Sequence, residues 1–404
     1  MNTLYLITLC FVITLLFTLS SAMNSYHSKK IPAMYVFGDS LVDCGNNNHL
    51  PSGGPNYLPF GIDFIGRKPT GRATNGKTLV DFVAMHLGLP FAPPFLGLSN
   101  HRRNKISTGI NYASGGSGIL PETNNDTRLT LDKQIKFFHR TVKHNLPKLF
   151  NEKEKLEKHM SESLFFVSTG VNDHFSNGTF RGNRKFALFL LNQFSLRIQK
   201  LIICYIILIN KNGTLTIYVC LVSLSEQFHI YEFSLSKIQS RFHMFALFVS
   251  NNITNGKFLS LLILWQRLHR LGARKFFVNN VPPAGCFPSK AVHETPRGKC
   301  NEKINKGISF YNRRLPQLLH DLQSKLPGFT FVLADLFGFL LEMRETGINH
   351  GILETWKPCC PNTIYGDLQC RPNDVPCPNR NTHLFFDNHP TQIVNQIFAS
   401  LYFN

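Results

Sequence analysis

The sequence predicts an α/β fold, and three observations support this prediction. Compact apolar runs, typical of buried strands, alternate with stretches whose apolar residues recur at helical spacing. Most of these runs are closely followed by glycine, serine or asparagine, which are typical of the turn after a strand. The polar side chains that could perform chemistry stand in these turns or in loops. Open α/β sheets keep their ligand sites at this edge, where the strands end.

The first predicted strand, Ile31–Phe37, leads into the tripeptide Gly38-Asp39-Ser40. A serine at this place is exposed at the edge of the sheet, and its backbone N–H can point at a developing negative charge. Val42 stands where a Gly-x-Ser-x-Gly elbow has its second glycine, so that motif is excluded. Because Gly-Asp-Ser is a common tripeptide, a turn without a catalytic role is the alternative interpretation.

Further strands are predicted at 163–169, 275–280 and 329–334, and residues 109–118 form a second transition from a strand to glycines. Glycines let the backbone approach a ligand and present N–H groups, although a flexible linker is the alternative. Asn172 follows the 163–169 strand and could donate its amide to an oxyanion. Asn172-Asp173 is equally typical of an ordinary turn.

Helices are expected where apolar residues form one stripe, with boundaries set by glycine and proline. Segment 151–160 is interpreted as a charged, solvated surface and nothing more. Residues 51–77 are interpreted as loops. The predicted helices span 78–87, 129–142, 186–198, 303–326 with a kink at Pro316, and 392–401.

The composition indicates a chain that can bury a large core, with 43% hydrophobic and 17% charged residues among 404. A formal net charge of +19 favours an anionic neighbour such as a membrane or an acidic polysaccharide. No block of Lys and Arg and no nucleic-acid motif stands out. We therefore expect no nucleic-acid partner, and the sequence identifies no partner protein.

The amino terminus is typical of a signal peptide at residues 1–22. Residues 4–19 are almost continuously apolar and precede Ser20-Ser21-Ala22, a small-residue cleavage site. The run is short for a membrane span, so no integral span is predicted. A secreted, extracellular protein is expected, in which disulfides are permitted and Asn125 and Asn177 are candidate glycan acceptors.

Four cysteines, Cys359, Cys360, Cys370 and Cys377, crowd into nineteen residues near the C-terminus. They stand beside prolines and without histidines at ligand spacing, which favours disulfides over a zinc site. We expect no metal and no cofactor. Cys359 or Cys360 should pair with Cys370 or Cys377, and Cys286 with Cys300. Cys44 should be a buried or free thiol.

Residues 200–265 differ from the rest of the chain in composition and in hydrophobic periodicity. They contain a nine-residue apolar run, 201–209, and then an aperiodic stretch rich in Phe, Ser, Asn and Leu. A lid over an apolar cleft is one interpretation. The preferred hypothesis is a translated intron, because 186–199 and 266–272 would join into one continuous helix that enters the 275–280 strand.

The candidate residues Ser40, Gly116, Asn172 and His389 all occupy strand ends or loops. A serine nucleophile, a histidine base, a carboxylate and further oxyanion donors are the components of acyl transfer. Each signal is weak alone, but their arrangement is specific.

On these motifs the chain resembles the plant GDSL-type esterases/lipases of the SGNH hydrolase superfamily. The resemblance covers nearly all of residues 31–404 except the atypical insertion. It implies a single domain, 23–404, with a flavodoxin-like three-layer α/β/α fold and a mostly parallel central sheet. The similar stretches are Phe37–Asp43 with the Asn46–Asn48 triplet, Gly61–Arg72, Asn75–Lys77, Asn111–Gly116, Ser168–Asp173, Leu271–Lys275, Cys359–Cys360 and His389–Thr391.

The resemblance also implies roles. Ser40 would be the nucleophile, His389 the base and Asp387 the residue that orients it. The oxyanion hole would comprise the N–H of Ser40, Asn172 and a glycine, with Gly116 chosen and Gly118 the alternative. The implied function is a secreted, cell-wall or apoplastic carboxylic-ester hydrolase that acts through an acyl-serine on small acyl esters, lipids or wall polymers. The alternative is a catalytically impaired SGNH-fold protein that binds wall glycan or lipid.

One departure from the family pattern concerns the spacing of the aspartate and the histidine. The family has two residues between them, whereas only Asn388 separates Asp387 from His389. On an extended backbone, a shift of one residue turns a side chain to the other face. Either the local loop compensates or the Asp–His hydrogen bond is lost.

Overall fold

The structure is a computed structural model that describes residues 30–124, 127–176, 179–180, 182–201, 206–211, 214–222, 228–234, 271–361 and 369–403. The predicted signal peptide and the candidate glycan sites Asn125 and Asn177 lie outside the described residues. Within the described ranges, no helix has both the length and the apolar character needed to cross a membrane.

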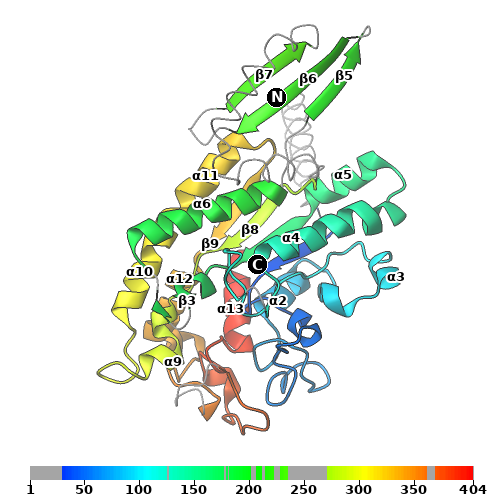
Figure 1. Cartoon of the computed structure of the whole chain (residues 1–404). Coiled ribbons are helices and arrows are strands. Elements are labelled where there is room, and N and C mark those ends of the chain that lie inside the picture. Colours follow the sequence, from blue (N-terminus) through cyan, green and yellow to red (C-terminus); the bar gives the residue numbers. More distant parts are fainter. Residues whose placement is uncertain are drawn as a thin grey trace, which may run out of the picture.

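A four-stranded parallel sheet forms the centre of the molecule, in the order β1-β2-β8-β9 (Figure 1). These strands correspond to four of the predicted ones, and the parallel sheet confirms the predicted fold class. Their carboxyl ends share one edge, to which the chain delivers Ser40 and Asn172. The strands are β1 (Met34–Gly38), β2 (Leu164–Ser168), β8 (Lys275–Asn279) and β9 (Thr330–Ala334).

The glycine-rich segment predicted as a second strand is not a regular strand, but its first part runs along the free edge of β1. Val36 N–H donates to the Ile110 carbonyl, and Tyr112 N–H donates to the Val36 carbonyl. Asn111 also forms a parallel bridge with Val36. This pairing carries the following glycines to the end of β1, beside Ser40.

Alternating strand residues point to opposite faces of the sheet, and each face is covered by helices. Tyr35, Phe165 and Phe276 belong to one core cluster, while Val36, Phe166 and Phe277 belong to the other. This pattern produces the predicted three-layer α/β/α arrangement (Figure 1).

The first core includes α4 (Leu131–Arg140), α5 (Lys153–Glu162), α6 (Arg184–Leu201), α10 (Glu302–Asn312) and α11 (Leu315–Lys325). The second includes α2 (Leu79–His86), α12 (Leu336–Thr346) and α13 (Gln392–Phe403). Short helices α3 (Asn100–Arg103) and α9 (Pro288–Ala291), the hairpin β3 (Phe175–Ser176) and β4 (Thr179–Phe180), and several single 3-10 turns lie in the connections.

Two predictions about helices are wrong. The segment interpreted as a solvated surface forms α5, because Met160 enters the core and the His159 ring lies within 3.3 Å of the Tyr35 hydroxyl. The expected single helix 303–326 is two helices, since α10 ends at Asn312, whose side chain exchanges two hydrogen bonds with the backbone of Val281. Pro316 then lies in the first turn of α11, where a missing N–H does no harm.

The helix expected at 186–198 is present as α6, and one apolar stripe of it faces the core. The buried apolar residues are Ala187, Leu190, Leu191, Phe194 and Ile198, whereas Leu188 is exposed. α6 ends at Leu201, just inside the atypical insertion.

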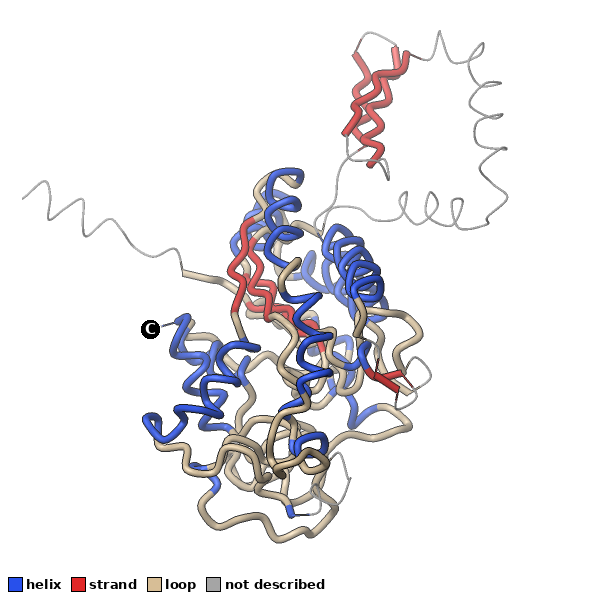
Figure 2. The backbone as a smooth tube through the Cα atoms, turned by 90° about the vertical axis from the view of Figure 1, so that its left-hand side faces the viewer, coloured by secondary structure: helices blue, strands red, loops and turns tan. Residues whose placement is uncertain are grey.

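Within that insertion, β5 (Ile206–Lys211), β6 (Thr214–Val222) and β7 (Phe228–Ser234) form a separate antiparallel sheet. Figure 2 shows this sheet outside the three-layer body. The chain leaves the body at the end of α6 and returns just before β8, at the amino edge of the central sheet. Ser40 lies at the opposite edge. The translated-intron interpretation and the lid interpretation both stay predictions.

We predict that deleting residues 200–265 yields a more soluble protein with a higher melting temperature and retained esterase activity. Among the α6 side chains that the structure describes, the last buried one is Ile198, so these core contacts survive the deletion. Removing the segment also shortens a loop, worth about 0.6 kcal/mol per halving of its length. Soluble yield, thermal unfolding and p-nitrophenyl ester hydrolysis are the measurements. A variant that misfolds, or that folds but is inactive, would make the segment a working part of the enzyme.

Candidate active site

Ser40 sits in a tight turn at the end of β1. Gly38 has a φ of +149°, and a Cβ there would collide with the Ser168 carbonyl of the neighbouring strand, so only glycine fits. The Asp39 carbonyl then accepts the N–H groups of Val42 and Asp43, which closes the turn and presents Ser40 to the cavity.

The side chain of Gln134 holds this turn in place, a role that the sequence analysis did not predict. Its side chain accepts the Gly38 N–H and donates to the Gly38 carbonyl, both at 2.9 Å. It also donates to the Ser117 hydroxyl, which links the turn to the glycine-rich segment. The available signal was a glutamine between the apolar positions Leu131 and Ile135 of the predicted helix.

Ser40, His389 and Asp387 form a continuous hydrogen-bond chain. The Ser40 hydroxyl lies 2.8 Å from His389 Nε2, and His389 Nδ1 lies 2.7 Å from Asp387 Oδ1. Asp387 is fully buried, while the His389 side chain keeps 14% of its surface exposed. The structure thus brings together three residues separated by up to 349 positions.

The short spacing between Asp387 and His389 is accommodated by a tight turn. Phe386 N–H donates to the His389 carbonyl, and Phe385 bridges Pro390 across the turn. Asp387 Oδ1 accepts the backbone N–H of His389 at 2.7 Å, as in an Asx turn, as well as contacting its ring nitrogen. Of the two expected outcomes, therefore, the loop compensates and the Asp–His hydrogen bond is kept.

The charges around His389 favour its protonated form. Burial alone would lower its pKa, but the Asp387 charge and hydrogen bond, with a smaller contribution from Asp39, raise it above the ordinary 6.5. Burial also raises the pKa of Asp39 to about 7, against the hydrogen bond from Leu41. Asp387 Oδ2 is buried and accepts no hydrogen bond from the part of the chain that the structure describes.

The three residues predicted to supply oxyanion donors, Ser40, Gly116 and Asn172, all line one cavity. The backbone N–H groups of Ser40 and Gly116 make no hydrogen bond with any described residue. Asn172 donates one amide N–H to the Ser117 carbonyl at 2.8 Å, which orients the side chain and leaves its second N–H. Gly118, the alternative glycine, packs against the Asp173 carboxylate, where a Cβ would collide. The geometry thus favours Gly116.

Two residues of the asparagine triplet hold the glycine-rich segment in place, a role that the sequence did not predict. Asn46 donates to the carbonyls of Asn111 and Ala113, and Asn47 donates to that of Gly115. Asp43 accepts the Gly115 N–H at 2.9 Å. These bonds fix Gly116 next to the Ser40 turn.

A cavity of about 1020 Å³ opens beside the triad. Its lining combines the catalytic candidates, apolar side chains and loop residues from both halves of the chain. It includes Ser40, Leu41, Pro55, Tyr57, Gly116, Arg128, Val171, Asn172, Phe175, Phe287, Lys290, Cys370, Arg371 and His389.

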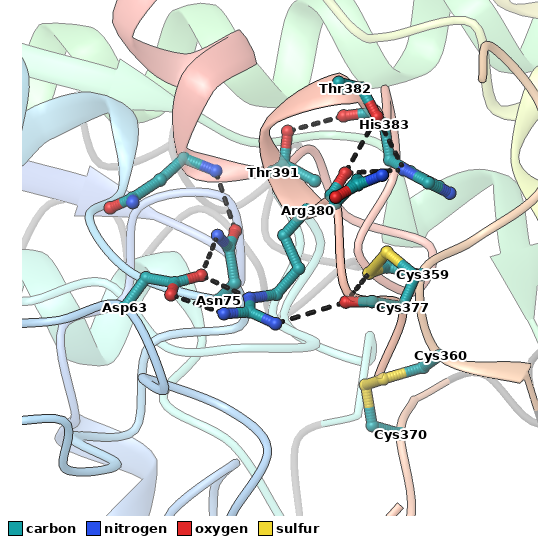
Figure 3. Close-up of a disulfide and its surroundings, with 12 residues drawn as sticks. Asp63, Asn75, Cys359, Cys360, Cys370, Cys377, Arg380, Thr382, His383 and Thr391 are labelled. Carbon is teal, nitrogen blue, oxygen red and sulfur yellow. Dashed lines mark hydrogen bonds and ion pairs between the residues drawn. A yellow bond between two sulfur atoms is a disulfide. The ribbon is translucent and has the colours of Figure 1, made fainter. Parts of the chain in front are cut away.

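The predicted disulfides are present and support the catalytic turn. Cys286 pairs with Cys300, Cys359 with Cys377, and Cys360 with Cys370, while Cys44 is a buried free thiol. The N–H groups of Cys359 and Cys360 donate to the carbonyls of Phe385 and Phe386, immediately before Asp387. The two C-terminal bridges (Figure 3) therefore anchor the segment that carries the orienting carboxylate.

A second clamp holds the other side of the turn (Figure 3). Asp63 makes a bidentate ion pair with Arg380, at 2.6 and 2.9 Å, and accepts the Asn75 amide. Asn75 in turn accepts the N–H of Gln392, three residues after His389. Thr74 donates to the Pro390 carbonyl at 3.0 Å.

The fold and site together define a Ser–His–Asp constellation at the carboxyl edge of a parallel α/β sheet, with candidate N–H donors in the same cavity lining. The family model for GDSL-like lipase/acylhydrolase matches residues 34–229 and 259–401. The chain therefore belongs to the GDSL-like lipase/acylhydrolase family, whose members are carboxylic-ester hydrolases. Of the predicted insertion 200–265, the family model leaves out only residues 230–258 and matches residues 200–229 and 259–265.

Curated relatives from Arabidopsis thaliana agree with this assignment. GDSL esterase/lipase 7 is 33% identical over 398 residues, covering 97% of this chain and 93% of the relative. Two further GDSL esterases/lipases are 34% and 31% identical, covering 94% and 91% of this chain and 86% and 80% of their own lengths.

Asp63→Asn should lower kcat roughly 3–10-fold with little change in KM for a small ester, because a loosened turn misplaces His389 rather than the substrate. Steady-state kinetics with p-nitrophenyl butyrate measures both constants. Glu152→Gln is the matched control, since it breaks the exposed Lys155–Glu152 pair far from the site. Equal kcat in both variants would show that the Asp63–Arg380 ion pair does not contribute to catalysis.

The acid limb of the kcat/KM profile should have an apparent pKa above 6.5, because only neutral His389 can accept a proton and its pKa is raised. Asp387→Asn removes the charge that raises this pKa, so the limb should move to lower pH while the plateau falls by about 10⁴-fold. An acid limb that stays in place in Asp387→Asn would show that another group controls it.

Proposed function

We propose that Ser40, His389 and Asp387 are the nucleophile, general base and orienting carboxylate of a carboxylic-ester hydrolase. The observation that carries this proposal is the unbroken chain from Ser40 Oγ through both ring nitrogens of His389 to Asp387 Oδ1. In such a chain the base accepts the nucleophile's proton, and the buried carboxylate stabilises the resulting imidazolium.

The first half of the reaction forms an acyl-serine. Ser40 Oγ attacks the ester carbonyl carbon and transfers its proton to His389 Nε2. The resulting oxyanion is stabilised by the N–H groups of Ser40 and Gly116 and by the free amide N–H of Asn172. When the intermediate collapses, the bond to the alcohol oxygen breaks and Nε2 returns the proton to the departing alcohol.

The second half releases the acid. Water enters the open cavity, gives a proton to His389 Nε2 and attacks the acyl-serine carbonyl. The same donors hold the second oxyanion, and its collapse frees the carboxylic acid and restores the Ser40 hydroxyl. Every step uses side chains and N–H groups of this chain, and none requires a cofactor or a metal.

The finer assignment is a secreted, extracellular enzyme acting on acyl esters of small molecules, lipids or wall polymers. Three disulfides support an oxidising compartment. The relatives' names, GDSL esterase/lipase, support ester substrates. The apolar residues Val171, Phe175 and Phe287 in the cavity lining are suited to an acyl chain.

The alternative of a catalytically impaired binding protein is not favoured. It rested on the shortened spacing between Asp387 and His389 and on the insertion. The first reason loses its force because the 2.7 Å hydrogen bond is formed. The second loses force because the insertion joins the body at the edge of the sheet opposite Ser40.

Ser40→Ala and His389→Ala should each reduce hydrolysis of p-nitrophenyl acetate and butyrate by at least about 10³-fold, because neither partner can replace the other. Circular dichroism and thermal unfolding should show both variants folded. A fluorophosphonate probe should label the wild type only at Ser40. Labelling that persists in Ser40→Ala would refute the assignment of the nucleophile.

A further inference from the structure

Two cationic side chains lie in the cavity lining together with the triad, and the proposed mechanism uses neither. Arg128 and Lys290 come from segments far apart in the sequence, and both line the cavity with Ser40 and His389. Arg371 is a third cation in the lining, but its backbone N–H donates to the Asp374 carboxylate beside it. The argument therefore rests on Arg128 and Lys290.

Arg128 lies against the oxyanion side of the site. A Cβ added to Gly116 would come within 3.1 Å of Arg128 Nε. Nη1 donates to Ser52 and to the Gly53 carbonyl, which holds the guanidinium in place. Neither Nε nor Nη2 makes a hydrogen bond or an ion pair with the residues that the structure describes. Those two nitrogens can therefore donate hydrogen bonds to a ligand.

Lys290 lies in a segment whose backbone contacts the catalytic turn, and its ammonium lies over Phe175. It belongs to α9, and its neighbour Ser289 donates its N–H to the Asn388 side chain at 3.0 Å, inside the catalytic turn. The Lys290 ammonium lies 5.2 Å from the centre of the Phe175 ring, another lining residue. No carboxylate in the described ranges pairs with it.

The acidic groups that the structure describes in the cavity lining do little to balance these charges. Asp43 is the one carboxylate among the described lining residues, and it is 2% exposed. Its two oxygens accept the N–H groups of Gly45, Asn46 and Gly115. Partial burial also lowers the pKa of Arg128, which indicates a cation that has lost part of its hydration. An anion entering beside it would restore favourable interactions.

We propose that this cavity is a binding site for esters that carry an anionic group such as a carboxylate, held by Arg128 beside Gly116 and by Lys290 beside Phe175. This inference rests on the proposed function of the same site and names its substrate class. Arg128 supplies directed N–H donors, and Lys290 supplies a second positive charge. The apolar residues between them accommodate the uncharged remainder of the ester.

The test is a charge series at constant shape, measured with the full-length protein. The acetyl esters of m-hydroxybenzoate, of its methyl ester and of m-hydroxyphenyltrimethylammonium place an anion, no charge or a cation on the leaving alcohol. The mono-p-nitrophenyl ester of adipic acid and p-nitrophenyl heptanoate make the same comparison on the acyl side.

In at least one series, kcat/KM should favour the anionic ester over the neutral one by roughly 10-fold, the effect of one good charge-assisted contact. The preference should shrink as salt is added, because salt screens partly exposed charges. Neutral esters that are hydrolysed with no preference for an anion in either series would overturn this inference and leave the proposed function standing. Neutral esters that are not hydrolysed in a Ser40-dependent way would refute the proposed function itself.

Variants identify the two residues separately. Arg128→Gln and Lys290→Gln should each reduce the preference at least about 3-fold while hydrolysis of the neutral ester changes less, and Arg128→Lys should restore part of it. Lys136→Gln, which removes an exposed charge on α4 outside the cavity, is the control for net charge. A preference that is equally reduced in Lys136→Gln would assign it to the overall charge of the protein and refute the site.

Discussion

The organisation of the active site depends on one carboxylate oxygen, Asp387 Oδ1, which binds both the backbone N–H and the ring nitrogen of His389. Because the two residues are separated only by Asn388, the same oxygen closes the turn and sets the orientation of the imidazole. In this chain, therefore, the turn and the catalytic hydrogen bond cannot be separated. The surrounding structure serves to hold that turn. Two disulfides anchor the segment before it, and the Asp63, Asn75 and Thr74 contacts fix the backbone after it.

The same interaction places stability and activity in opposite pH ranges. The folded-state pKa of His389 is raised, so its contribution to stability is complete below the unfolded value of about 6.5 and is lost as the pH rises through the folded value. Catalysis needs the neutral imidazole, which forms only as that stabilisation is lost. The disulfides and the Asp63–Arg380 pair do not depend on this titration. They can hold the turn under the conditions in which the enzyme works.

The sequence predicted the parts of the structure that local patterns specify. Four strands, Ser40 and Asn172 at strand ends, and a disulfide framework follow from apolar runs, turn residues and cysteine spacing, whereas the mostly parallel sheet was implied by the family resemblance. Contacts between distant residues were not predictable in this way. Nothing local shows that Asp63 meets Arg380 across 317 positions, or that Asn47 holds Gly115. The roles of Gln134 and of α5 were missed because a polar or charged residue on a partly buried face resembles a solvated one until its partner is known. The break before Pro316 likewise depends on a contact between distant residues, because the Asn312 side chain binds the backbone of Val281, which follows β8.

The most direct test of the account is proton NMR of the imidazole of His389 in the uninhibited enzyme. The hydrogen bond from Nδ1 to Asp387 should give a strongly downfield-shifted proton resonance at low pH. It should persist in Ser40→Ala, which leaves the turn intact, and disappear in Asp387→Ala. Two results would contradict the claim that the shortened turn keeps the Asp–His pair. They are the absence of this resonance in Ser40→Ala and its persistence in Asp387→Ala.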